Sequence, residues 1–259
     1  MNGVLLFAVQ EDIVNFSKPK VNYIELAEYC ATQVDKHLDV PVSLVTNISI
    51  NSKKFDKIIK CNLHSRQTKK IAGEKILWLN FDRCKSWKFT PYKNTLVLDT
   101  DFIVKNNTLK NVFDCSNDLL INKTYVDIND RSDNTVERLV PHGIDMYWAT
   151  VFYFTKNKKT KTFFDLVEHI QNNWYYYRML YSISNRKFRN DFAFSIAIHI
   201  LSGYTSTDWP CELPDPLISS FDNDQVFNID NLQGDFLVNT KNMNTHIMNK
   251  VALTELLNA

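Results

Sequence analysis

Glycine is scarce in this sequence, with 5 among 259 residues. Loops that wrap a phosphate through backbone N–H groups need several glycines at fixed spacing, and neither the Walker nor the Rossmann pattern is present. Cysteine is also sparse, with 5 scattered residues and no Cys-x-x-Cys pair. The sequence therefore supports neither a zinc knuckle nor a dithiol redox motif.

Long hydrophobic runs are missing as well. The first apolar run, Val4–Val9, is too short to cross a membrane and follows no basic segment, so we expect neither a membrane span nor a signal peptide. An odd, dispersed set of cysteines is typical of reduced thiols, which predicts a cytoplasmic protein. A net charge of +1 gives no bulk attraction to nucleic acid. Abundant Lys, Asn and Ile indicate an AT-rich genome, as in a bacterium or phage.

The most informative stretch that is present runs from Thr95 to Val104. Its apolar run Leu96–Leu98 is typical of a strand buried on both faces. Asp99 and Asp101 follow, and side chains two residues apart on a straight strand share one face. Carboxylates at the end of a buried strand are costly unless they are neutralised, and hard cations such as Mg²⁺ and Mn²⁺ prefer oxygen ligands. The pattern predicts a metal-linked site.

The first half of the chain alternates between strand and helix patterns. A helix is expected at Val21–Leu38, Ile76–Trp87 is ambiguous, and strands are expected at Gly3–Val9, Pro41–Thr46, Lys57–Cys61 and Leu96–Leu98. This alternation predicts an α/β fold with a mainly parallel central sheet flanked by helices. Ligands of such sheets bind beyond the carboxyl ends of the strands, where Asp99 and Asp101 are placed.

The second half is less regular. Residues Lys105–Pro141 are polar and predict loops with one short strand, Thr124–Ile128, and Lys156–Lys161 is expected to form a basic turn. Helices are expected at Thr162–Asn172 and Phe192–Leu201, and strands at Tyr147–Phe154, Gln225–Ile229 and Phe236–Val238. No internal repeat or linker is evident.

In this order the features resemble the nucleotide-diphosphosugar transferases of the GT-A fold, in particular the glycogenin-like, family 8-like branch. The matching parts are the first strand, the helix near Tyr23, Arg83-Cys84-Lys85-Ser86-Trp87, Thr90-Pro91-Tyr92, Leu98-Asp99-Thr100-Asp101, the strand around Val151, Asp191, His246 and Lys250. The resemblance covers most of the chain and implies one domain, 1–259, with a donor half at 1–104 and an acceptor half at 105–259. It implies a glycosyltransferase that takes a sugar from a nucleotide-diphosphate donor, a UDP-sugar by expectation.

The resemblance also implies a metal site. Asp99 and Asp101 would bind Mn²⁺ or Mg²⁺ across the two donor phosphates, where the ion stabilises the leaving diphosphate as a Lewis acid. His246 would supply a third ligand and Lys250 a phosphate contact. The family usually separates these two by six residues with a glycine between them, whereas here the step is four without glycine. The alternative places both on one face of a C-terminal helix.

Further donor contacts follow from the same resemblance. Arg83 matches a family cation that contacts the donor sugar or phosphate, for which a planar guanidinium is suited; the alternative is a solvated cation at a helix end. Tyr23 matches a tyrosine that stacks on the donor base, beside Val9 and Gln10, or else packs against its neighbours. Thr100 lies within the Asp-x-Asp motif.

On the acceptor side, Asp191 matches an acidic residue that faces the reacting sugar, and its alternative is a helix N-cap. The family often has Asn-x-Gly where this chain has Trp148-Ala149-Thr150, so the acceptor pocket departs from the pattern. The acceptor itself stays open: a glycan, a protein, a lipid-linked sugar or a modified DNA base. The cluster Trp174–Tyr177 either stacks on such rings or packs within the fold.

Two rival classes fit parts of the sequence. A haloacid-dehalogenase-type phosphotransferase also ends an apolar strand in Asp-x-Asp, with the first aspartate as nucleophile. That class usually places Thr or Val four residues after the nucleophile, where this chain has Ile103. The other rival is a non-catalytic relative that binds sugar or nucleic acid without turnover.

Overall fold

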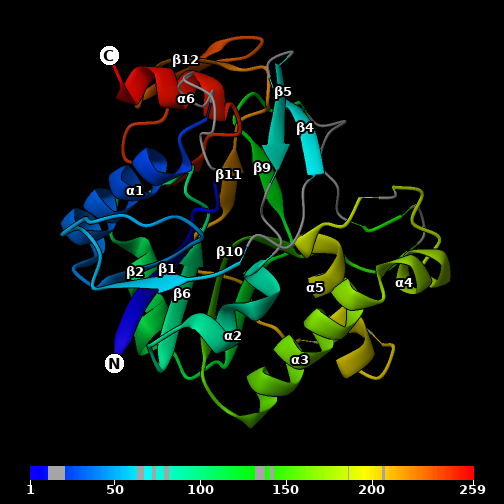
Figure 1. Ribbon diagram of the computed structural model, residues 1–259. Helices are drawn as coiled ribbons and strands as arrows, with labels where there is room; N and C mark the ends of the chain where they lie inside the picture. Colours follow the sequence, from blue (N-terminus) through cyan, green and yellow to red (C-terminus); the bar gives the residue numbers. More distant parts are fainter. Residues whose placement is uncertain are drawn as a thin grey trace.

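The structure is a computed structural model that describes residues 1–10, 21–62, 67–71, 74–78, 82–131, 138–140, 143–185, 187–205 and 208–259. Its central sheet has six strands in the order β3-β2-β1-β6-β10-β8 (Figure 1). Their bounds are β1 Asn2–Phe7, β2 Val42–Thr46, β3 Lys57–Lys60, β6 Asn94–Leu98, β8 Leu119–Asn122 and β10 Trp148–Thr155. The first four pair in parallel, and β10 runs antiparallel between β6 and β8. The predicted mainly parallel α/β sheet is confirmed.

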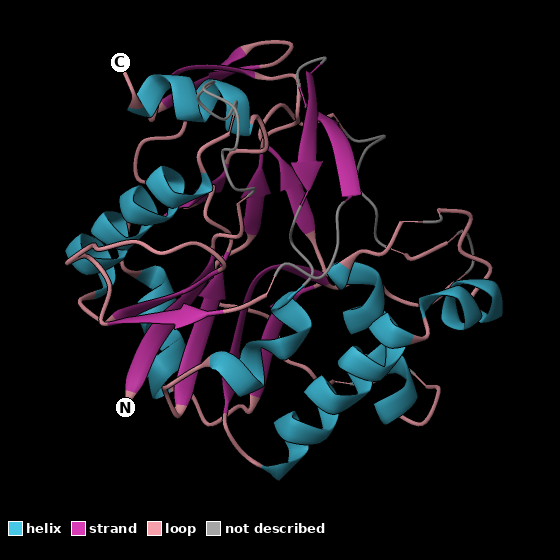
Figure 2. Cartoon of the chain, in the orientation of Figure 1, coloured by secondary structure: helices cyan, strands magenta, loops and turns pink. Residues whose placement is uncertain are grey.

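Helices cover both faces of this sheet (Figure 2). The helices of the chain are α1 Tyr23–Leu38, α2 Ser86–Phe89, α3 Lys158–Asn172, α4 Trp174–Leu180, α5 Asn190–Leu201 and α6 Lys250–Leu257. Of these, α6 packs against α1 rather than on the central sheet. Because alternate side chains of a strand point to opposite faces, Leu5 and Phe7 pack in the cluster that contains α3 and α5, whereas Val4 and Leu6 pack in the cluster that contains α1. One apolar strand therefore serves two separate cores.

The predicted helix at Val21–Leu38 is confirmed as α1. Asn22 caps its N-terminus by accepting the N–H of Glu25 at 3.3 Å, and Asp39 ends it in the left-handed region with φ 54°, a conformation that Asp tolerates better than most residues. Its apolar residues recur at helical spacing and pack on the sheet. The N-cap residue, the spacing of the apolar residues and the residue that ends the helix therefore all agree with the bounds of α1.

A second sheet brings distant segments together, in the order β7-β15-β11-β9. Its bounds are β7 Phe102–Ile103, β9 Tyr125–Asp127, β11 Leu217–Ser219 and β15 Thr245–His246. The register pairs His246 with Phe102, and the N–H of Ile247 donates to the carbonyl oxygen of Asp101 at 2.9 Å. This sheet carries the C-terminal segment to the end of β6.

The remaining elements are short. They are the hairpin of β4 Gln67–Ile71 and β5 Glu74–Trp78, the 3-10 helices Asp82–Lys85 and Thr108–Asp114, and the three-stranded meander β12 Gln225–Asn228, β13 Asn231–Gln233 and β14 Leu237–Asn239. The ambiguous stretch Ile76–Trp87 thus contains part of β5, a 3-10 turn and the start of α2. No helix among the described residues is long and apolar enough to cross a membrane.

Two predictions for the second half are wrong. The stretch Lys105–Pro141 holds β8 as well as β9, because the three-residue apolar run Leu119–Ile121 becomes part of a strand once β10 pairs with it. The basic turn Lys156–Lys161 is largely helix, because Asn157 and Thr160 form a capping box that starts α3 at Lys158. The strands β11 and β13 were also not predicted, since each has three residues and too little pattern to detect.

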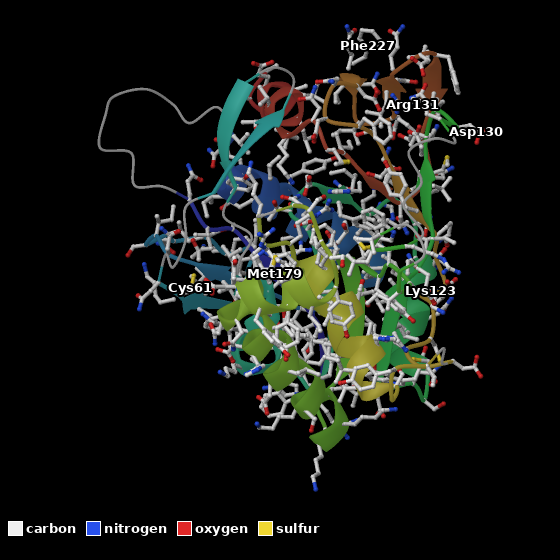
Figure 3. The ribbon with its side chains drawn as sticks, turned by 90° about the vertical axis from the view of Figure 1, so that its right-hand side faces the viewer. Cys61, Lys123, Asp130, Arg131, Met179 and Phe227 are labelled. Carbon is white, nitrogen blue, oxygen red and sulfur yellow. The ribbon has the colours of Figure 1, made fainter. Side chains whose placement is uncertain are left out.

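A buried ion network ties β9 to the loop before β12, at the end of the molecule where Figure 3 labels Arg131. The guanidinium of Arg131 donates to both oxygens of Asp127 at 2.6 and 2.7 Å and to both oxygens of Asp224 at 2.8 Å. It also lies 4.0 Å from the ring centroid of Phe221. Burial raises the pKa of Asp127, but the hydrogen bonds from Arg131 outweigh it and lower the pKa below 3.8.

Candidate functional site

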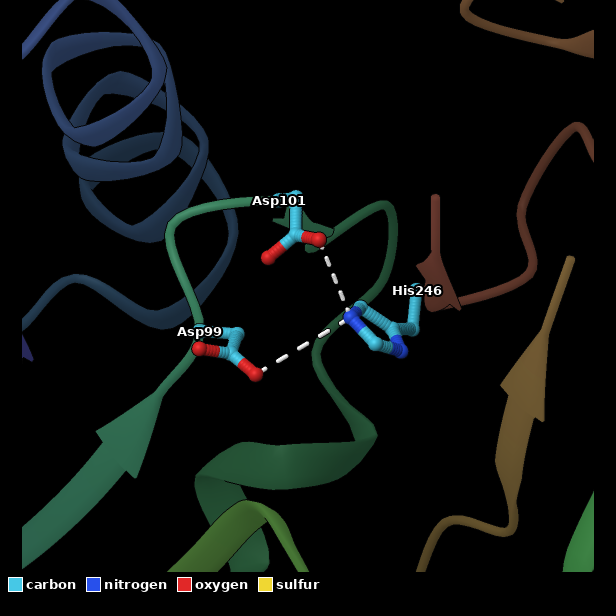
Figure 4. A group of neighbouring side chains, drawn as sticks. All are labelled: Asp99, Asp101 and His246. Atoms are coloured by element: carbon cyan, nitrogen blue, oxygen red, sulfur yellow. Dashed lines mark hydrogen bonds and ion pairs between the residues drawn. The ribbon is translucent and has the colours of Figure 1, made fainter. Parts of the chain in front are cut away.

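Asp99, Asp101 and His246 form one cluster at the carboxyl end of β6 (Figure 4). The Nε2 atom of His246 lies 3.0 Å from Asp101 Oδ2 and 3.9 Å from Asp99 Oδ2. One ligand atom from each residue lies within 4.8 Å of the others. The strand ends at Leu98, and the N–H of Phe102 donates to the carbonyl oxygen of Asp99 at 3.0 Å. The two aspartates therefore converge through a turn, and the expected straight strand is wrong.

The third member arrives from the second sheet rather than from a helix. His246 belongs to β15, and Lys250 is the first residue of α6, so the alternative of one shared helix face is wrong. The N-terminus of α6 is capped by Asn249, whose side chain accepts the N–H of Ala252 at 3.1 Å. This cap starts the helix at Lys250 and fixes where its side chain emerges.

Ser219 orients the imidazole, and sequence reasoning missed it. His246 Nδ1 lies 3.1 Å from Ser219 Oγ. The hydroxyl can donate to the carbonyl oxygen of Ser220 at 3.1 Å or of His246 at 3.3 Å, which leaves its oxygen free to accept the Nδ1 proton. That tautomer turns an Nε2 lone pair toward the carboxylate of Asp101. The arrangement is repulsive until a cation, either a proton or a metal ion, lies between them.

Asp101 is fully buried, with a side chain 0% exposed. Its Oδ2 accepts from the ammonium of Lys250, whereas its Oδ1 has no hydrogen-bond partner among the described residues. Burial raises its pKa, but the charge of Lys250 outweighs this and lowers the pKa well below the ordinary range. Burial likewise lowers the pKa of Lys250, while Asp101 and Asp99 raise it above the ordinary value. The site holds a carboxylate with one unoccupied acceptor.

Arg83 contacts the other aspartate. Its guanidinium donates to Asp99 Oδ1 and to the carbonyl oxygen of Ala149, and its side chain is 2% exposed. The alternative of a solvated cation is therefore wrong. Ser86 holds the local turn by donating to the carbonyl oxygen of Arg83 at 2.7 Å. The two carboxylates and the cations Arg83 and Lys250 cancel in formal charge. Within the described part of the chain, the Oδ1 of Asp101 is left to accept from a further donor or to bind a cation.

Asp191 lies on the other side of Ala149. Its Oδ1 accepts the N–H of Ala149 at 2.9 Å, and its Oδ2 accepts from Nη2 of Arg189 at 2.7 Å. Arg189 is the N-cap residue of α5, and no side-chain hydrogen bond caps this helix. The helix-cap alternative for Asp191 is therefore wrong. Contacts connect Asp99 to Asp191 through Arg83 and Ala149.

The expected donor residues lie at the ends of β1 and α1. Val9 and Gln10 are buried, and Asn47 extends the pairing of β1 with β2: Gln10 N–H donates to Asn47 Oδ1 at 2.8 Å, and Asn47 Nδ2 donates to the carbonyl oxygen of Gln10 at 2.6 Å. The Oε1 of Gln10 has no partner within the described parts of the chain. Asn47 directly follows a strand, which is the signal that would have found it.

Tyr23 and Thr100 complete the expected set. Tyr23 begins α1, and burial raises its pKa to about 12, with smaller effects from Lys250, Asp101 and Asp99. Thr100 is buried between the two aspartates. The structure places both beside the cluster, and their roles toward a donor stay predictions.

Comparisons with known proteins bear on the fold. No protein-family model and no curated protein matches the chain. An active-site variant of LgtC matches with a TM-score of 0.50 and 14% identity, over 75% of this chain and 69% of that chain. The galactosyltransferase LgtC in complex with donor and acceptor sugar analogues has a TM-score of 0.48 and 14% identity, over 75% and 70%.

The glycosyltransferase GlyE of Streptococcus pneumoniae TIGR4 has a TM-score of 0.40 and 14% identity, and the match spans 77% of this chain but 42% of GlyE. At these identities the likeness concerns the backbone. Together with the sheet order, the match to the LgtC variant shows that the chain has a GT-A-like fold.

Proposed function

We propose that the protein is a metal-dependent glycosyltransferase that moves a sugar from a nucleotide-diphosphate sugar, a UDP-sugar by expectation, to an acceptor. The observation that carries the proposal is the buried Oδ1 of Asp101, which has no hydrogen-bond partner among the residues that the structure describes and lies in the cluster of Asp99, Asp101 and His246. Buried polar atoms are nearly always bonded, so this oxygen fits a site that is completed by a ligand. The GT-A-like fold supports the same conclusion.

The residues present fit a divalent cation. Asp99 and Asp101 would offer carboxylate oxygens, which Mg²⁺ and Mn²⁺ both accept, and His246 would offer a nitrogen, which favours Mn²⁺ of the two. When bound, the ion supplies Lewis acidity toward the departing diphosphate. Ser219 would keep the imidazole in the ligating tautomer.

The charges predict how the donor binds. The formal charges of Asp99, Asp101, Arg83 and Lys250 already cancel, so a diphosphate would add negative charge that these residues alone do not balance. We therefore expect donor and cation to bind together, each strengthening the other. Tyr23, with Val9, Gln10 and Thr100, would contact the nucleoside part, and Lys250 and Arg83 the phosphates or the sugar.

Asp191 is proposed as the catalytic carboxylate. Sugar transfer passes through an oxocarbenium-like state, and a fixed negative charge near the anomeric carbon stabilises it. Ala149 and Arg189 hold the two oxygens of Asp191 from different sides, so the carboxylate is oriented before substrate binds.

The rival functions make different predictions. A phosphotransferase would use Asp99 as nucleophile, but the guanidinium of Arg83 donates to its Oδ1, which lowers its reactivity. Differential scanning fluorimetry separates the classes: a glycosyltransferase is stabilised by UDP with Mn²⁺, and a phosphotransferase by beryllofluoride with Mg²⁺. Release of sugar and UDP from a panel of nucleotide sugars then tests turnover. Stabilisation by UDP with Mn²⁺ but no sugar release from any donor would indicate the non-catalytic relative.

A further inference from the structure

A concave site that does not include Asp99, Asp101 or His246 lies in the second half of the chain. It is a cavity of about 190 Å³ between the segment before β10 and the C-terminal part of α5. Figure 3 looks onto the side of the molecule that carries α4 and α5. The lining residues used below are Arg138, Asp145, Tyr147, Ser195, His199 and Tyr204.

One lining residue, Ser195, contacts the backbone of the residue that carries the proposed catalytic carboxylate. Ser195 Oγ accepts the N–H of Tyr147 at 2.8 Å and donates to the carbonyl oxygen of Asp191 at 2.8 Å. An α-helix rises about 1.5 Å per residue, so the backbone positions of Ser195 and His199 lie about 6 and 12 Å from that of Asp191 along the axis of α5. A ligand in the cavity would therefore lie beyond an acceptor sugar that reacts near Asp191. It could still belong to the same oligosaccharide as that sugar.

The lining combines rings with hydrogen-bonding groups. The ring of His199 meets Tyr204 edge-on at 5.4 Å and Tyr181 at 5.9 Å. Tyr204 is 65% exposed and has φ 63°, a backbone region unfavourable for a bulky side chain. The lining also offers the hydroxyl of Ser195, the imidazole of His199 and the carboxylate of Asp145 as hydrogen-bonding groups. A pyranose presents hydroxyls to such groups and C–H faces to rings with an apolar body.

Size and charge distinguish among the acceptors left open by the sequence. The volume of about 190 Å³ is below the roughly 300 Å³ of the smallest drug-sized pockets, so it suits one ring. Among the described lining residues, the charged ones are one cation, Arg138, and one anion, Asp145. Nucleic acid is held mainly by several Lys and Arg on phosphates, which this lining does not offer.

We propose that this cavity is a subsite for one neutral sugar residue of an oligosaccharide acceptor, beyond the sugar that reacts. The proposal rests on the proposed glycosyl transfer. It makes the acceptor a glycan rather than a DNA base, and it makes Tyr204 and His199 determinants of acceptor length.

The test compares Tyr204→Asn with Tyr175→Asn. Asparagine tolerates a positive φ, so Tyr204→Asn removes the ring without straining the turn. Tyr175 is 73% exposed on α4 and does not line the cavity, so Tyr175→Asn is the matched control. His199→Phe is a second variant that keeps a ring and removes its hydrogen bonds. Thermal unfolding checks that each variant is folded.

Binding is measured by saturation-transfer NMR with trisaccharides of glucose, galactose and N-acetylglucosamine and with their monosaccharides. We expect a trisaccharide to bind the wild type, Tyr204→Asn to weaken it about two- to tenfold, the scale of one ring contact, and Tyr175→Asn to leave it unchanged. Hydrolysis of the nucleotide sugar should be the same in all variants.

If Tyr175→Asn weakens trisaccharide binding as much as Tyr204→Asn does, the proposed subsite is wrong. It is also wrong if the wild-type protein hydrolyses the nucleotide sugar but binds no trisaccharide. Binding of duplex DNA with hydroxymethylated bases, without trisaccharide binding, overturns it in favour of a nucleic-acid acceptor. Trisaccharide binding by a protein that hydrolyses no donor would keep the cavity as a sugar site and reject the proposed transfer.

Discussion

Arg83 and Asp191 are fixed to the two backbone groups of one residue. Arg83 donates to the carbonyl oxygen of Ala149, and Asp191 accepts the N–H of Ala149 at 2.9 Å. Because Arg83 also donates to Asp99, a displacement of Ala149 would disturb both the metal cluster and the proposed catalytic carboxylate. Ala149, in the segment Trp148-Ala149-Thr150, thus connects the surroundings of Asp99 with those of Asp191.

Replacing either metal-site aspartate should abolish metal-supported donor binding. We expect Asp99→Asn and Asp101→Asn to bind UDP no better with Mn²⁺ than with a chelator, as measured by calorimetry. Asp39→Asn, on an exposed side chain, is the control. Asp101→Asn leaves Lys250 buried without its carboxylate, which costs about 3 kcal/mol or more. Thermal unfolding without ligand therefore checks that each variant is folded at the temperature of the calorimetry. Unchanged affinity in the single variants would contradict the site.

Metal and nucleotide should bind cooperatively. The charges of the four ionised residues cancel, so neither a diphosphate nor a divalent cation gains its full electrostatic partner alone. We expect Mn²⁺ affinity to rise at least about tenfold in the presence of UDP, within the usual range of coupling between sites. Titration of Mn²⁺ by electron paramagnetic resonance with and without UDP measures it. Equal affinities would show that the cluster does not serve the diphosphate.

Asp191→Asn should lower turnover by about a hundredfold or more, the scale of losing one electrostatic stabiliser. Asparagine retains an oxygen for the N–H of Ala149 but loses the charge, so affinity for UDP should change little. Asp165→Asn, at an exposed ion pair with Lys161, is the matched control. Near-normal turnover in the Asp191 variant would leave the carboxylate a structural role only.

The ion network of Arg131 should make stability depend on pH. The folded pKa of Asp127 is lowered below 3.8, so its contribution is fully present above the unfolded value of about 3.9 and is lost as pH falls through the folded value. Asp127→Asn should cost about 3 kcal/mol at pH 7, as for one partner of a buried pair. Urea unfolding from pH 7 to pH 3 should show this difference shrinking. A constant difference would mean that the carboxylate charge contributes nothing.

The sequence alone determined the elements whose signals are local. The apolar run Leu96–Leu98 predicted the strand before the Asp-x-Asp pair, the helical spacing of apolar residues in Val21–Leu38 predicted α1, and the alternation of strand and helix patterns predicted the layered sheet. These signals need neighbours only a few residues away in the chain. One domain spanning 1–259, with a donor half and an acceptor half, and a cytoplasmic location stay predictions.

Tertiary structure decided what depends on partners far along the chain. The strands β8 and β11 exist because β10, β15 and β9 pair with them, and no three- or four-residue pattern reveals that. His246 reaches Asp101 from 145 positions away, and Ser219 orients it from a third segment. Residue chemistry singled out Asp99 and Asp101, and the family resemblance added His246. Only the turn after Leu98 and the second sheet bring their atoms together, because convergence is set by backbone pairing rather than by residue type.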